Sequence, residues 1–247
     1  METYKNAPAR EAILDIRILP LLTEVEVEEK AERLSTDFSV LYPDKKTQRK
    51  FEERISINEK GEKTSESTSR VSGYFFWSAN KKMLVQLRED GFSFNMLAPY
   101  THWNDFFQKA MEGWSFFRKH VGHGTINRMA IRYVNEIALP FDDPGFKFQD
   151  YISNMPPIPP SLPQIFKGFF LQTHVQVDKE KNIDAVITET VGPKQDGTPV
   201  FILDIDTFID GPSCATEDMI KCFAQLREIK NKVFESCITD NTRRLFR

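Results

Sequence analysis

Polar side chains recur at every second position in three segments that otherwise have the composition of strands. Because successive strand residues point to opposite sides of a sheet, each polar set is expected opposite the apolar residues of its own strand. If the three strands share one sheet, this face would hold cations, an imidazole and carboxylates, which suits an anion or a polar ligand. The predicted ligand-binding residues are Arg128, Arg132, Gln172, His174, Asp204 and Asp206.

The same residues support two other interpretations. Arginines and aspartates on one face can neutralise one another in salt bridges, which would leave no site. Alternatively, His174, Asp204 and Asp206 could serve a metal-dependent hydrolase or transferase. Two carboxylates two residues apart are a weak signal for a divalent cation, so the sequence leaves these interpretations open.

Sequence motifs that identify common enzyme classes are absent. The chain contains no Walker phosphate loop, G-x-G-x-x-G, H-E-x-x-H, G-x-S-x-G or paired-cysteine zinc pattern. We therefore expect a non-catalytic interaction or ligand-binding protein, with no catalytic residue, metal or cofactor assigned. Its expected partner is another protein or a small polar ligand, and a homodimer is compatible with the sequence.

The composition is that of an ordinary globular protein. Of 247 residues, 40% are hydrophobic and 28% charged, and the formal net charge is -3. This charge gives no general attraction to nucleic acid or anionic membranes, so nucleic-acid binding rests on fold analogy alone. No apolar run reaches the roughly 18 residues of a membrane span, and the first residues lack the order of a signal peptide. We expect a cytoplasmic location.

The expected secondary structure combines long strands with amphipathic helices. Residues 125–140, TINRMAIRYVNEIALP, are apolar at odd positions and charged at several even positions, which predicts a strand with one buried face. Thr23 and Glu26 form a capping-box pattern that predicts a helix start. Long helices are predicted over 103–120 and 217–237. A polar, turn-rich connection, expected to form a mobile hairpin, is predicted over 60–72.

The order of these elements repeats along the chain. Each half reads as a strand, a helix, three or four antiparallel strands and a long helix, which predicts an α+β fold with an internal duplication. The halves are predicted over 8–122 and 123–238, either as two units or as one continuous domain. This order resembles the TATA-box-binding protein and the helix-grip folds.

Several stretches also resemble one protein family. They are APAREAILDIRI, GFSFNMLAPYTHW, INRMAIRYVNEIALP and LDID, and they spread over nearly the whole chain. In these stretches the chain is similar to a sporadically distributed bacterial family of about 250 residues with unknown function. The resemblance implies a bacterial, cytoplasmic protein, and it carries no activity or catalytic residue.

Overall fold

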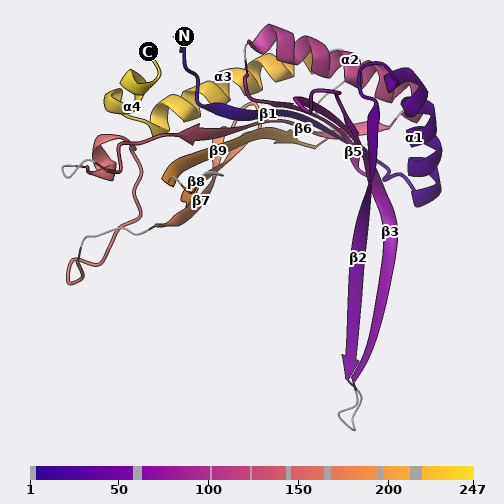
Figure 1. Ribbon diagram of the computed structural model, residues 1–247, viewed down its shortest axis with the longest axis horizontal. Helices are drawn as coiled ribbons and strands as arrows, with labels where there is room; N and C mark the ends of the chain where they lie inside the picture. The colour runs from indigo at the N-terminus through magenta and orange to yellow at the C-terminus, as the bar shows by residue number, and fades with distance from the viewer. Residues whose placement is uncertain are drawn as a thin grey trace.

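The computed structural model describes residues 4–57, 63–100, 102–122, 124–142, 146–163, 168–193, 197, 199–211 and 219–247. Within these ranges an arched antiparallel sheet carries helices along its outer side (Figure 1). The fold is therefore α+β, as the sequence predicts. The strands are β1 Ala9–Leu19, β2 Asp44–Ile57, β3 Lys63–Trp77, β4 Met83–Arg88, β5 Gly91–Leu97, β6 Thr125–Ile137, β7 Phe170–Asp178, β8 Ile183–Pro193 and β9 Pro199–Asp210. The helices are α1 Glu24–Phe38, α2 Trp103–Val121, α3 Met219–Cys237, α4 Asp240–Leu245 and the 3-10 turn η1 Phe148–Asp150.

The sheet is continuous across both halves of the sequence. Its strand order is β2-β3-β4-β5-β1-β6-β9-β8-β7. At its centre β1 pairs with β6, where Leu14 lies opposite Ile131. On one side of this pair, β1 is followed by β5, the strand that precedes α2. On the other side, β6 is followed by β9, the strand that precedes α3. The remaining strands continue outward in reverse chain order.

One face of the sheet is covered by α1, α2 and α3 (Figure 1). The alternation predicted for the central strand is confirmed, since Met129, Ile131 and Tyr133 are buried toward the helices while Arg132 is exposed. Both long helices, α2 and α3, pack on this same side of the sheet. The largest apolar cluster joins strands of both halves to all three helices. The two halves consequently share one core.

Local sequence signals fix the helix ends where side chains reach the backbone. The Thr23 hydroxyl accepts from the Glu26 amide and the Glu26 carboxylate accepts from the Thr23 amide, so the predicted capping box is confirmed. Helix α2 ends at Gly122, whose φ of 82° favours glycine. The expected start of α3 at residue 217 lies outside the described residues.

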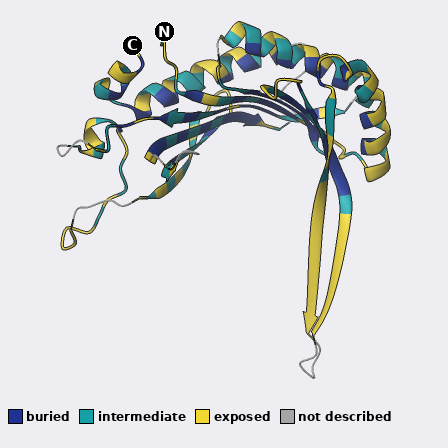
Figure 2. Ribbon diagram, in the orientation of Figure 1, coloured by how far each residue is buried: buried dark blue, intermediate teal, exposed yellow. Residues whose placement is uncertain are grey.

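The hairpin expected after residue 60 is confirmed, but two expectations about the extent of elements are wrong. The stretch predicted as a polar connection over 60–72 contains the whole exposed part of β3, residues 63–69, which pairs with β2 from Ile57↔Lys63 inward. Antiparallel pairing satisfies the hydrogen-bonding groups of the backbone whatever the polarity of the side chains. This hairpin extends into solvent as an arm (Figure 2). The helix expected as the second element of each half is, in the second half, only the 3-10 turn Phe148–Asp150. The prolines that follow at residues 156 and 157 offer no continuation for a longer helix.

Among the described residues, no helix combines the length and the apolarity that crossing a membrane requires.

Candidate functional site

The predicted polar residues of β6 and β9 lie together on the face of the sheet away from the helices, and they are paired with each other. Arg132 holds Asp204 through two hydrogen bonds, Nε to Oδ1 at 2.8 Å and Nη2 to Oδ2 at 2.5 Å. Arg128 donates to Asp206 at 2.8 Å and to Asp15 at 3.1 Å. The side chain of Arg128 is only 13% exposed, so this pair is largely withdrawn from water.

The first half of the chain completes this network. Asp15 of β1 also accepts from Arg88 at 2.7 Å, and Arg88 binds Asp90 at 2.9 Å. Burial raises the pKa of Asp206, against the opposing effect of the Arg128 charge. Both predicted arginines therefore form salt bridges with carboxylates. This is one of the alternative interpretations that the sequence left open. Their ligand-binding role stays a prediction.

His174 and Gln172 occupy the same face but belong to the outermost strand, β7. The ring of His174 lies 3.1 Å from Asp184, and Gln172 donates to Thr188 at 3.0 Å. His174 is opposite Val186 of β8, which in turn is opposite Asp206 of β9. Two strand spacings, about 10 Å, therefore separate the backbone of His174 from that of the aspartates predicted to work with it.

The structure does not gather the residues of the metal-dependent alternative. The carboxylates of Asp204 and Asp206 face arginines, and His174 faces a different aspartate. In the described parts of the chain, no three His, Cys, Asp or Glu side chains are grouped so that they could hold a metal ion.

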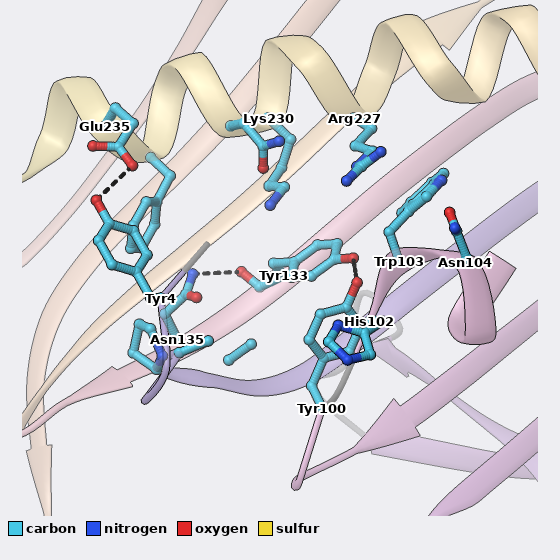
Figure 3. A pocket seen from close by; sticks show the side chains of 15 residues that line it. Tyr4, Tyr100, His102, Trp103, Asn104, Tyr133, Asn135, Arg227, Lys230 and Glu235 are labelled. Carbon is cyan, nitrogen blue, oxygen red and sulfur yellow. Dashed lines mark hydrogen bonds between the residues drawn. The ribbon is translucent and has the colours of Figure 1, made fainter. Parts of the chain in front are cut away.

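A cavity of about 350 Å³ lies on the opposite side of the sheet, under α3 (Figure 3). The N-terminal segment, the start of α2, strand β6 and helix α3 form its walls. Helix α3 contributes residues at i, i+3, i+4, i+7 and i+8, which share one helical face. These are Arg227, Lys230, Asn231, Phe234 and Glu235. Tyr4, Tyr100, His102, Trp103, Asn104, Tyr133 and Asn135 form most of the remaining lining.

Two cations of α3 point into this cavity (Figure 3). The Lys230 amine lies 4.0 Å from the centre of the Tyr133 ring, and the Arg227 guanidinium lies 5.1 Å from that of Trp103. Within the described part of the chain neither cation forms an ion pair. Burial, with a smaller effect of the Arg227 charge, lowers the pKa of Lys230 to about 7. The folded protein therefore holds this amine near the midpoint of its titration at neutral pH.

Two tyrosine hydroxyls meet at the floor of the cavity. The oxygens of Tyr100 and Tyr133 are 2.7 Å apart, so one hydroxyl donates to the other (Figure 3). Burial raises the pKa of both phenols, which keeps them protonated. Because two hydroxyl groups share one mutual bond, one hydroxyl hydrogen stays available to a ligand.

The acidic residue of the cavity is already neutralised. Glu235 accepts from Tyr4 at 2.8 Å and from Arg243 at 2.8 Å. At the other end, α2 begins with His102 as N-cap and without a side-chain hydrogen bond to its free amides. A helix N-terminus carries partial positive charge. The cavity consequently has an excess of positive over negative charge.

The sequence does not single out this cavity. Arg227, Lys230 and Asn231 look like the solvated face of an amphipathic helix, and Tyr133 follows the apolar register of its strand. The only local signal is the run of cationic and amide side chains at helical spacing on α3, which a solvent-exposed helix would share. Tyr100 and Lys230 are brought together by the packing of α3 across β6.

No protein-family model matches this chain, and no curated protein is detectably similar to it in sequence.

Proposed function

We infer that this protein binds a small organic anion in the cavity between α2, β6 and α3, and does so without catalysis. The observation that carries this proposal is the Lys230 amine, which points into the cavity without an ion pair among the described residues. Lys230 is partly buried, and a cation withdrawn from water is costly unless a negative charge compensates it. A ligand carboxylate or phosphate beside Lys230 and Arg227 would supply that charge.

The size and the walls of the cavity narrow the class of ligand. A volume of about 350 Å³ lies at the lower end of the range for small-molecule sites. Trp103, Tyr133 and Phe234 offer aromatic surface, and the Tyr100–Tyr133 pair offers a hydroxyl donor. These features suit a compact molecule with an apolar or aromatic body and one anionic group.

The test is a titration of the purified protein with benzoate and with inorganic phosphate, followed by calorimetry. We expect saturable binding, and Lys230→Met should raise the dissociation constant about tenfold or more, because a hydrogen bond to a charged group is worth about 1.5–3 kcal/mol. Lys232→Met is the matched control, since Lys232 is exposed on the same helix and does not line the cavity. Equal affinities for the parent protein and Lys230→Met would overturn the proposal.

The pH dependence of binding gives a second measurement. The pKa of Lys230 is lowered to about 7 in the free protein, so the ammonium form is lost as the pH rises through this value. Benzoate stays ionised over this range. Its affinity should therefore fall between about pH 6 and about pH 9 in the parent protein, and should be flat in Lys230→Met. A flat profile in the parent protein would mean that Lys230 does not meet the anion.

The inferred architecture behind this cavity is a duplicated unit of the TATA-box-binding-protein or helix-grip kind. Its support is the strand order, in which β1 with β5 and β6 with β9 occupy matching places about the central pair. Counted over the described residues, the second half has one strand fewer, and the 3-10 turn Phe148–Asp150 replaces its first helix. Superposing the two halves of an experimental structure would test the duplication. The cytoplasmic location and the bacterial family expected from the sequence stay predictions.

A further inference from the structure

The arm formed by β2 and β3 leaves the body of the protein without support from any other described element. Residues 49–57 and 63–69 are all exposed (Figure 2). The exposed part of β2 spans about 30 Å at the rise of an extended strand. Isolated two-stranded hairpins are marginally stable in water, so an arm of this length gains from a further strand.

The outer edge of β2 is available for such a strand. Among the described strands, β2 is the first in the sheet order and pairs only with β3. Along this edge Phe51 is 74% exposed, and Ile55 and Ile57 are each 62% exposed on the same side of the arm. An edge with exposed apolar residues and free backbone groups is a template for pairing with another chain.

The charges along this edge are complementary to those of the same edge in a second copy of the chain. The sequence from Arg49 to Glu53 places two basic residues before Phe51 and two acidic residues after it. In an antiparallel pair of two β2 strands related by a two-fold axis at Phe51, Lys50 lies opposite Glu52 of the second copy. In the same register Arg49 lies opposite Glu53, and the two Phe51 rings meet. Each cross-strand ion pair then occurs twice.

Most of these charges have no competing ion pair within one chain. Arg49 donates to the hydroxyl of Ser69, and Glu53 accepts from that of Ser65. In the part of the chain that the structure describes, ion pairs of Arg49, Glu52 and Glu53 are absent, whereas Lys50 binds Glu89. We propose that the arm is a dimerisation element, which pairs β2 with β2 of a second copy of this chain in the register centred on Phe51.

Charge reversal tests the register. The double variant Glu52→Lys/Glu53→Lys makes all charges of residues 49–53 basic, and Arg49→Glu/Lys50→Glu makes them all acidic. Like charges directly opposite each other destabilise a strand pair, so each variant alone should show a dimer dissociation constant raised at least about tenfold in sedimentation velocity. An equimolar mixture of the two variants should recover the dimer, because the basic edge then faces the acidic edge.

Recovery of the dimer in the mixture would show that each variant alone had lost the pairing between copies and had kept its fold. Lys63→Glu is the matched control, since it reverses an exposed charge on β3 that lies opposite the uncharged Ile57 and away from the outer edge of β2. This control should dimerise like the parent protein. A parent protein that sediments as a monomer at all concentrations would overturn the proposal, as would a dimer that neither charge reversal weakens. Two variants that stay monomeric when mixed would also contradict the proposed register.

Discussion

At the scale of single residues, the carboxyl group of Glu189 is buried with incomplete hydrogen bonding, which destabilises its charged form. It is 1% exposed on the helix-facing side of β8, and Asn154 donates to one of its oxygens at 3.1 Å. Its other oxygen has no hydrogen-bond partner among the residues that the structure describes. Burial raises the pKa of Glu189 to about 6, since desolvation outweighs the single hydrogen bond.

This pKa predicts a pH-dependent stability. A raised folded-state pKa favours the protonated carboxyl, so the contribution is fully present below the ordinary pKa of 4.5 and is lost as the pH rises through about 6. Glu189→Gln keeps an acceptor for Asn154 without the charge. At neutral pH it should stabilise the fold by about 2 kcal/mol relative to the parent protein, and the difference should vanish in acid. Urea unfolding at several pH values measures both, and a variant less stable than the parent at neutral pH would contradict the argument.

At the scale of secondary-structure elements, the salt bridges between β6 and its neighbours differ in exposure. Arg128 is 13% exposed and holds Asp15 and Asp206, whereas Arg132 is 48% exposed and holds Asp204. Removing one partner of a buried pair leaves a charge without compensation, while an exposed pair contributes little. The two arginines, although four residues apart on one strand, should therefore respond differently to truncation.

We expect Arg128→Ala to cost about 3–5 kcal/mol of unfolding free energy and Arg132→Ala about 0–1 kcal/mol. Chemical denaturation of both variants in parallel makes each the control for the other. Equal losses would show that exposure does not govern this network. A ligand found to bind the parent protein but not Arg132→Ala, with an unchanged melting temperature, would instead support the binding role predicted for this face.

At the scale of the whole molecule, one sheet and one apolar cluster join the two halves of the chain. Trp114 of α2 is 4% exposed. Its ring stacks on that of Phe117, with ring centres 5.2 Å apart, and meets that of Phe92 edge-on, with ring centres 5.7 Å apart. The cluster to which these residues belong also contains Phe223 and Leu226 of α3. The halves predicted over 8–122 and 123–238 should consequently unfold together.

Trp114→Ala should lower the free energy of unfolding by about 3–5 kcal/mol, through lost burial and the cavity left behind. Because the core is shared, fluorescence and circular dichroism should report a single transition at a lower denaturant concentration. Two separate transitions, only one of them shifted, would show that the halves are independent units. Trp103→Phe is a suitable comparison, since Trp103 is only partly buried beside the cavity and its aromatic volume is largely kept.

The sequence by itself determined the elements whose signals are local. The alternation in 125–140 predicts β6, because strand side chains point to alternate faces, and the apolar spacing in 103–120 predicts α2. The capping box at Thr23 and Glu26 is equally local, since it joins a side chain to a backbone amide three residues away. The shared face of the predicted polar residues follows from the same parity argument.

Only the tertiary structure decided which of these elements meet. Asp15 and Arg88, which complete the salt-bridge network of the polar face, come from the first half of the chain. The spacing of residues along the sequence does not predict their contact with Arg128. The exposed part of β3 is polar along its length, so its strand conformation depends on the backbone hydrogen bonds that β2 supplies. The cavity needs Tyr100, Tyr133 and Lys230 together, and their contact arises where α3 crosses β6. Long-range packing, and not local propensity, places the Lys230 amine in that cavity and sets its pKa.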